Sequence, residues 1–496
     1  MKNEIKSAIV VGSGFGGLAA ALRLKSIGYD VTLLEKLNQV GGRARVFRKD
    51  GFVFDAGPTV ITAPFLFDEL FKLFDKKRSD YVSFVELDPW YQFYFDDERV
   101  FNYGGTIRDT EEEIKKFSCE DVKGYRKLVS MSEKIFNVGF TELSHVPFDN
   151  FWFMLKQIPK LVKLKSYLTV YQLVSKYIKH PYLKKALSIQ PLLLGGNPIS
   201  TTSIYNLIHF LERKWKVHYA LGGTGAIVKA LRRLMIEESI KIKTNMEVKK
   251  ILFKDKKAIG VELLNNKKLF SDIVVFNGDP SYAYLKMIPQ NLIKRWSKKK
   301  IENLEFSMGL FVIFFGTDKI YNNIEHHTIW MGKRFKGLLK DIFSGDHLPD
   351  DFSLYLHRPT ATDKTTAPKN CDSFYVLSPV PNLKSKICWQ EEGDRYKNKI
   401  LKALENTILP GLGKHLKTCF YMTPVDFKED YLSYNGSGFS ISPIFSQSAW
   451  FRYNNKAEDF ENLFFVGAGT HPGAGVPGVL SSAKVLENIL KNKNGK

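Results

Sequence analysis

The hydrophobic pattern near the N-terminus predicts two buried strands joined by a helix. Ala8-Ile9-Val10-Val11 is a continuous apolar run, and the glycine-rich segment Gly12 to Gly17 follows it directly. Apolar residues recur at helical spacing from Leu18 to Ile27, and a second apolar run, Tyr29 to Leu34, ends at Glu35. Continuous apolar runs of this length are typical of strands buried on both faces of a parallel sheet. The segment is therefore predicted to form a βαβ unit.

Alternation and turn residues predict the remaining elements. A hairpin is expected at 45–54, and strands are expected within 82–103, around a turn at 96–99. From 110 to about 216 helical spacing dominates, with breaks expected at Pro147, Pro159, Pro181 and Pro191. Later elements are a helix at 226–238, strands at 247–253 and 273–276 flanking a hairpin at 258–270, alternating strands and helices at 281–454, a strand near 464–467 and a closing helix from about 478.

Composition narrows the range of functions. The chain has 496 residues, 44% of them hydrophobic, which is enough for two or three domains with separate cores. The net charge is +21, but no nucleic-acid motif accompanies it, so nucleic acid is not an expected partner. Two explanations of the positive charge remain, namely attraction to an anionic membrane and solubility without a specific partner. Cysteines 119, 371, 388 and 419 form no CxxC pair and have no histidine spacing suited to zinc, so we expect reduced thiols and no metal site.

No segment predicts secretion or a membrane span. The apolar stretch before Gly12 is too short for a signal peptide. The longest apolar run, Met308 to Phe315, is far shorter than the ~20 residues that a spanning helix needs. We therefore expect a cytoplasmic protein that is soluble or bound to one membrane surface.

The glycine-rich turn carries the first candidate chemistry. Gly12 permits a tight turn, Gly14 lets the backbone approach a pyrophosphate, and Gly17 lets helix and strand pack closely. Phosphates are favoured at the N-terminus of the following helix, where free N–H groups and the helix dipole attract anions. Glu35 stands where it can accept hydrogen bonds from ribose hydroxyls. This pattern predicts a dinucleotide-binding unit.

The next segment distinguishes between cofactors. Gly41-Gly42-Arg43 follows Glu35 within one short loop, and Asp55-Ala56-Gly57-Pro58-Thr59 comes after the expected hairpin. A nicotinamide dehydrogenase would normally continue into another helix. An arginine after two glycines suits bidentate contact with a phosphate or a ring carbonyl. Here the chain resembles the FAD-dependent amine-oxidase-like flavoproteins, in which the strand-end Glu and the GGR motif both touch FAD, so the resemblance implies FAD.

The C-terminal motifs make the resemblance more specific. They are Gly436 to Ser440, Gln447 to Arg452 and Val466 to Val479. Together with Gly51 to Thr59, Leu194 to Pro198, Gly222 to Gly225 and Leu354 to His357, they resemble the bacterial, lycopene-forming phytoene desaturases, essentially end to end. These belong to the carotenoid and retinoid oxidoreductase family. One departure is Gly469, where many amine-oxidase-like relatives have an acidic residue; this weakens an amine-oxidase interpretation.

The resemblance implies a function and a set of site residues. The function is that of an FAD-dependent oxidoreductase acting on CH–CH groups, which introduces double bonds into phytoene by successive dehydrogenations to give lycopene in carotenoid biosynthesis. Alternatives are a carotene isomerase, a ketolase or oxygenase on the same scaffold, or a non-catalytic prenyl-binding carrier. The expected FAD-binding residues are Gly12, Gly14, Phe15, Gly17, Glu35, Lys36, Gly42, Arg43, Gly57, Pro58, Thr59, Val248, Gly467, Ala468, Pro477, Gly478 and Val479.

The predicted fold is α/β and discontinuous along the chain. A Rossmann-like FAD-binding domain is expected to combine residues 1–80, 222–280 and 455–496. A mixed-sheet substrate-binding domain would combine 81–109 with 281–454. Residues 110–221 would form a helical lid, which is the candidate membrane-facing domain.

A carotenoid precursor offers no charge or carbonyl to grip, so its site should be a long apolar tunnel with few buried polar groups. The protein orients the polyene while FAD accepts hydride. A proton must also leave, and His209, Glu212 and His471 are candidates to accept it. A structural role is favoured for His209 and Glu212 and is as plausible as proton transfer for His471, so no catalytic residue is assigned.

A membrane partner follows from residues 151–187. The first half of this segment mixes large apolar residues such as Trp152 and Phe153 with Lys156, Lys160 and Lys163. This mixture suits a peripheral surface on the cytoplasmic membrane that draws in a lipid-soluble substrate, or equally a basic solvated face of a helical lid. The long apolar carotenoid would be the substrate, with oxygen or a quinone as electron acceptor.

Overall fold

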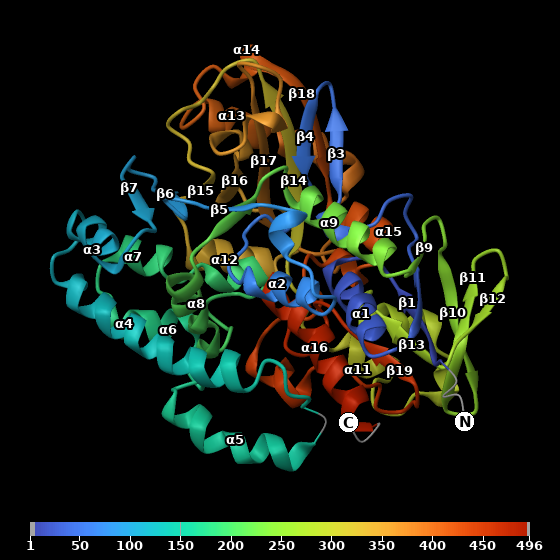
Figure 1. Cartoon of the computed structure of the whole chain (residues 1–496). Helices are drawn as coiled ribbons and strands as arrows, with labels where there is room; N and C mark the ends of the chain where they lie inside the picture. Colours follow the sequence, from blue (N-terminus) through green and yellow to red (C-terminus); the bar gives the residue numbers. More distant parts are fainter. Residues whose placement is uncertain (1–4, 149, 494–496) are drawn as a thin grey trace.

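The computed structural model describes residues 5–148 and 150–493 (Figure 1). Its first sheet contains five parallel strands in the order β19-β13-β1-β2-β9, so the predicted βαβ unit lies at its centre. The two ends of the chain meet in this sheet, because β1 and β19 both flank β13. The strands are β1 Ser7–Val11, β2 Asp30–Leu34, β9 Lys241–Lys243, β13 Ile273–Phe276 and β19 Leu463–Phe465.

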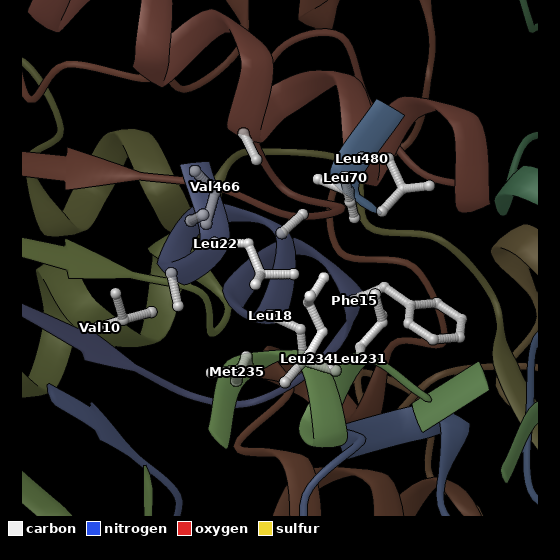
Figure 2. Close-up of a cluster of buried hydrophobic side chains, with 14 of the residues drawn as sticks. Val10, Phe15, Leu18, Leu22, Leu70, Leu231, Leu234, Met235, Val466 and Leu480 are labelled. Carbon is white, nitrogen blue, oxygen red and sulfur yellow. The ribbon is translucent and has the colours of Figure 1, made fainter. Parts of the chain in front are cut away.

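One apolar core packs against this sheet (Figure 2). Helix α1 (Phe15–Ser26) lies at its centre and places Leu18 and Leu22 between side chains of the other helices. Those helices are α2 (Phe65–Lys72), α9 (Thr224–Glu237) and α16 (Val476–Lys493), which contribute Leu70, Leu231 and Leu480, among others. Complete burial of such side chains contributes roughly 1.5–3 kcal/mol each. Segments from both ends and the middle of the chain thus share one core.

A second sheet has seven strands in the order β18-β14-β17-β16-β15-β6-β7. It is antiparallel except where β15 pairs parallel with β6, so it is a mixed sheet. β14 is buried at every residue, which explains its unbroken apolar sequence. The strands are β6 Tyr91–Tyr94, β7 Val100–Tyr103, β14 Gly309–Thr317, β15 His327–Trp330, β16 Leu354–His357, β17 Asp372–Val380 and β18 Leu416–Met422.

Three smaller sheets complete the β structure. An antiparallel sheet joins β10, β11 and β12, and two-stranded sheets join β3 to β4 and β5 to β8. The strands are β3 Val46–Lys49, β4 Phe52–Asp55, β5 Phe84–Glu86, β8 His218–Ala220, β10 Val248–Lys254, β11 Lys257–Leu263 and β12 Lys268–Phe270. The predicted α/β class is therefore confirmed. The division into three domains stays a prediction.

Residues 107–215 are mainly helical, as expected, and form the lower left of Figure 1. The expected break at Pro159 is wrong: Pro159 lies inside α5. Proline has no backbone N–H group, so α5 lacks one backbone hydrogen bond in its interior. The helices are α3 Ile107–Lys115, α4 Asp121–Phe136, α5 Phe151–Lys163, α6 Val170–Tyr177, α7 Pro181–Ala186 and α8 Leu207–Trp215.

The remaining helices pack around the sheets. They are α10 Pro280–Tyr282, α11 Lys298–Glu302, α12 Lys336–Ser344, α13 Trp389–Glu405, α14 Leu412–His415 and α15 Pro424–Tyr431. Helix boundaries differ slightly from expectation, since α1 begins at Phe15 rather than Leu18 and α16 at Val476 rather than Gly478. Within the described residues, no helix has both the length and the apolar character required to cross a bilayer.

Candidate functional site

One continuous cavity of about 580 Å³ connects the two sheets. Its first part is lined by the glycine-rich turn, the end of β2, the Gly41–Ala44 loop and the start of α16. Its second part is lined by apolar side chains from the helical region and the seven-stranded sheet, including Leu161, Leu193, Leu310 and Ile329. A polar part of the cavity, lined by backbone, thus continues into an apolar part, which we call the chamber.

The glycine-rich turn has the geometry that its sequence predicts. Gly12 has a φ of +93°, which is unfavourable for residues with a side chain. Gly14 precedes α1 and lines the cavity, so the N-terminal N–H groups of α1 lie at its wall. A Cβ on Gly17 would lie 2.0 Å from the carbonyl oxygen of Gly12. Gly17 is therefore required for close packing of helix and strand.

Glu35 lies at the C-terminal end of β2 and is 6% exposed. Its Oε2 accepts a hydrogen bond from the backbone N–H of Ser13 at 2.9 Å, and its Oε1 accepts one from that of Leu37 at 2.9 Å. The hydroxyl of Ser13 also donates to Oε2. These bonds fix the carboxylate at the cavity wall, where its remaining lone pairs suit ribose hydroxyls.

Arg43 is half-buried and lines the same cavity. Its guanidinium donates to the hydroxyl of Ser433, while its Nε has no partner among the described residues. A buried guanidinium N–H without an acceptor is costly, and an anionic or carbonyl oxygen of a ligand would satisfy it. The preceding Gly42 has a φ of +55°, and a Cβ there would lie 3.1 Å from the Cα of Gly14. The GGR segment therefore lies directly against the glycine-rich turn.

The C-terminal segment closes the other side of the cavity. Arg452 is 1% exposed, and its guanidinium donates to the backbone carbonyl of Ala468 at 2.7 Å and to that of Thr470 at 3.1 Å. These bonds shape the loop between β19 and α16. Helix α16 begins at Val476, so its N-terminal N–H groups lie at the cavity, as expected for stabilising negative charge on a bound ring.

The structure brings sixteen of the seventeen expected FAD-binding residues to this cavity. They are Gly12, Gly14, Phe15, Glu35, Lys36, Gly42, Arg43, Gly57, Pro58, Thr59, Val248, Gly467, Ala468, Pro477, Gly478 and Val479. Gly17 is the exception, because it faces the carbonyl of Gly12 rather than the cavity. The orphaned Nε of Arg43, the glycine backbone and two helix N-termini fit a flavin dinucleotide.

Asp279 places a carboxylate in the same cavity as Gly469, the position where many amine-oxidase-like relatives have an acidic residue. Gly469 cannot supply a carboxylate, but Asp279 lines the cavity after β13, the neighbouring strand. Its carboxylate accepts from the backbone N–H of Ser281 and of Tyr434, and burial raises its pKa. In the sequence, the signal for this carboxylate is its place directly after an apolar strand, in the segment Asn277-Gly278-Asp279.

Two polar residues stand in the wall of the apolar chamber. Glu212, on α8, is fully buried, and its Oε1 accepts a hydrogen bond from the hydroxyl of Tyr91 at 2.9 Å. Its Oε2 has no partner among the described residues. Burial raises the pKa of Glu212 to about 7, although the bond from Tyr91 opposes this shift. The side chain can therefore change protonation state near neutral pH.

The two candidate histidines have structural contacts. His209 is fully buried, does not line the cavity, and has Nε2 2.9 Å from the carbonyl oxygen of Leu187. His471 lines the cavity, with Nε2 3.2 Å from the carbonyl oxygen of Leu143. Burial lowers the pKa of both to about 4, so both are neutral at physiological pH. Each bond uses the ring nitrogen as donor, which suits a bracing role.

Comparisons with known proteins agree with this site. The family model described as flavin containing amine oxidoreductase matches residues 15–485. The chain is 41% identical over 487 residues to a phytoene desaturase (lycopene-forming) of Pseudescherichia vulneris, covering 98% of this chain and 99% of the relative. It is 39% identical over 489 residues to a phytoene desaturase (neurosporene-forming) of Rhodobacter capsulatus, covering 97% and 93%.

A solved oxidoreductase from Methanosarcina mazei has the same fold, with a TM-score of 0.64 at 16% identity, covering 98% of this chain and 100% of that one. The fold and the site therefore define an FAD-dependent oxidoreductase of the flavin containing amine oxidoreductase family. Within that family the chain belongs to the phytoene desaturases.

Proposed function

We propose that this protein binds FAD in the polar part of the cavity and desaturates phytoene in the apolar part, in successive dehydrogenations that give lycopene. The observation that carries the proposal is the continuity of the two parts: one cavity joins the residues expected to hold FAD to an apolar chamber. When bound, FAD supplies the two-electron oxidant that accepts hydride from the substrate. The walls of the chamber orient the hydrocarbon and exclude water.

Glu212 is the group that this geometry favours as proton acceptor. Glu212 lines the chamber, and its Oε2 has no hydrogen-bond partner among the described residues, so it is free to accept the proton that leaves the carbon next to the one that loses hydride. The hydroxyl of Tyr91 stabilises the carboxylate form and orients it. A base with a pKa near the working pH is the most effective for this task.

A membrane surface at α5 is the second part of the proposal. Exposed apolar side chains of this helix include Trp152, Ile158 and Val162, which are 71%, 42% and 57% exposed and which we call the α5 apolar face. Exposed Lys156 and Lys160 lie between them in the sequence, and exposed Lys163 follows Val162. Apolar side chains flanked by lysines favour binding to an anionic bilayer.

The opposite side of α5 supports a route for the substrate. Met154, Gln157 and Leu161 line the cavity from the same helix, at the spacing of a second face. The helix also contacts the loop that follows Phe445, where Trp450 packs against Phe151 with ring centroids 5.9 Å apart. One helix thus separates the outside of the molecule from the chamber, at the lower edge of Figure 1. A lipid-soluble substrate would pass beneath α5 from the bilayer.

The test uses the FAD-loaded protein with phytoene dissolved in anionic vesicles. Lycopene in the extracted lipids, identified by its absorption spectrum and chromatography, is the expected product. Neurosporene as the end product would retain desaturation but change the number of steps, which depends on the length of the chamber. Bound FAD with unchanged phytoene would contradict the proposal, whereas isomerised but not oxidised product would favour the isomerase alternative. Paired assays with oxygen or a quinone as the sole acceptor identify the electron acceptor.

A further inference from the structure

Three histidines form a buried cluster beside the site. His327 begins β15 and His357 ends β16, and the two are paired across these antiparallel strands. His326 precedes His327, and all three are at most 3% exposed. One ring nitrogen from each residue lies within 4.8 Å of one from each of the others. None of the three lines the cavity, so the cluster is separate from the proposed redox site.

In two of the rings one nitrogen is hydrogen-bonded to a hydroxyl oxygen: His326 Nδ1 lies 2.7 Å from Thr362 Oγ1, and His327 Nδ1 lies 2.7 Å from the hydroxyl of Tyr355. His357 Nε2 faces Asp55 Oδ2 at 3.8 Å, which is too far for a hydrogen bond. For His326 and His327 this is the arrangement found around metal-binding histidines, whose second nitrogen is held by an oxygen that fixes the ring orientation. The carboxylate of Asp55 is itself held by the hydroxyl of Thr224 at 2.8 Å.

At least one nitrogen of each ring has no hydrogen-bond partner. His326 Nε2, His327 Nε2 and both ring nitrogens of His357 are buried without a hydrogen bond within the described residues. Leaving a buried polar atom unsatisfied costs about 1–3 kcal/mol, so four in one place require a common explanation.

We propose that His326, His327 and His357 bind one divalent transition-metal ion, with zinc as the ion that suits this ligand set best. Zinc accepts three imidazoles at Zn–N distances of about 2.0–2.1 Å and takes a fourth ligand from water or an oxygen. Tetrahedral ligation brings the nitrogens to roughly 3.4 Å apart, so nitrogens that now lie within 4.8 Å of one another must approach by about 1.4 Å at most. The carboxylate of Asp55 and the unpartnered hydroxyl of Tyr219 are the nearby oxygen groups.

The position of the cluster indicates a structural role. Asp55 ends β4 and leads into Gly57-Pro58-Thr59, which lines the cavity. Tyr355, which holds His327, also lies 3.0 Å from the hydroxyl of Thr59. A metal on the histidines would therefore hold this cavity-lining loop to the seven-stranded sheet. The ion would stabilise the folded protein without exchanging electrons with substrate.

The test begins with the wild-type protein, purified with FAD bound and without a metal-affinity tag. After chelation and dialysis it is incubated with Zn²⁺ or Co²⁺, freed of excess metal, and analysed for metal by mass spectrometry. About one ion per chain is expected, with a Tm that rises on reloading, because a ligand that binds only the folded state stabilises it. Co²⁺ should give the visible absorption of a tetrahedral site. Fewer than about 0.1 ion per chain together with an unchanged Tm would overturn the proposal and leave a hydrogen-bonded cluster of neutral histidines.

Variants locate the ion. His326→Gln and His357→Gln should each lose the metal and the metal-dependent rise in Tm, while flavin absorbance reports that the fold is retained. His415→Gln is the matched control, because His415 is exposed and pairs with Asp318 at 2.8 Å far from the cluster in sequence. Metal retained by both cluster variants would place the ion elsewhere and reject the assignment. If a variant does not fold, the wild-type measurement decides alone.

Discussion

The hydroxyl of Tyr91 donates a 2.9 Å hydrogen bond to Glu212 Oε1, and this pair joins the seven-stranded sheet to helix α8 in the wall of the cavity. The other oxygen of the carboxylate has no hydrogen-bond partner in the described part of the chain. A buried carboxyl group in an apolar wall is expensive, so its presence there is better explained by chemistry than by stability. Glu212 should therefore affect the rate of desaturation, the pH dependence of that rate and the stability of the folded protein.

Replacing Glu212 with Gln should remove the proton acceptor and leave the shape of the chamber. We expect the rate of desaturation to fall about 10²- to 10⁴-fold, the usual contribution of a general base. Product formation per bound FAD measures the effect. An activity within threefold of wild type, with FAD content unchanged, would show that the proton leaves by another route.

Glu212 should also set the acidic limb of the pH profile. Burial raises its pKa to about 7, so the active carboxylate is lost as the pH falls through 7. The bond from Tyr91 lowers this pKa, so Tyr91→Phe should move the limb to higher pH without abolishing activity at pH 9. Initial rates from pH 5 to 9 test this prediction. A limb that stays in place in the variant would contradict the assignment.

The same carboxyl group should destabilise the protein above neutral pH. Its pKa is raised from 4.5 in the unfolded chain to about 7 in the folded protein, so the native state binds the extra proton and loses stability as the pH rises from 4.5 to 7. Glu212→Gln should therefore be more stable than wild type at pH 8, by up to about 3 kcal/mol, and similar at pH 4.5. Denaturant unfolding at the two pH values measures the difference.

Gly17→Ala tests the packing behind the FAD-binding turn. The added Cβ would meet the carbonyl oxygen of Gly12 at 2.0 Å, so helix and strand must separate. We expect a loss of about 1–3 kcal/mol in stability and reduced flavin content, although Gly17 does not line the cavity. Gly337→Ala is the control, because Gly337 is an exposed position of α12 and its Cβ would approach only the flexible side chain of Arg334. Equal behaviour of the two variants would show that the close contact is unimportant.

The α5 apolar face is tested by a triple substitution of Trp152, Ile158 and Val162 with Ser. Binding to anionic vesicles should weaken more than tenfold, since each buried side chain contributes roughly 1.5–3 kcal/mol. The matched control replaces Ile236, Leu264 and Phe270, which are 54%, 61% and 66% exposed and lie on other elements. Vesicle flotation at low and high salt measures binding. Comparable losses in both triple variants would show that the effect is nonspecific.

The local patterns determined the βαβ unit and its ligand-binding turn. Gly12, Gly14 and Glu35 each act through short-range geometry, namely a positive φ, a close backbone approach and a strand end, which neighbouring residues define. The apolar runs also located most strands, because a strand buried on both faces needs an unbroken apolar sequence. The expected break at Pro159 was wrong because the surrounding residues of α5 have the amphipathic pattern of a helix, and a single proline does not interrupt it.

Only the tertiary structure decided which distant residues meet. Asp279 and Gly469 line the same cavity, and Tyr91 of the seven-stranded sheet reaches Glu212 on helix α8, although the residues of each pair are far apart along the chain. The same holds for His326, His327 and His357, whose spacing resembles no known zinc motif and whose convergence depends on the register between β15 and β16. Sequence periodicity reports which face a residue occupies, but pairing between segments is set by the packing of the whole core.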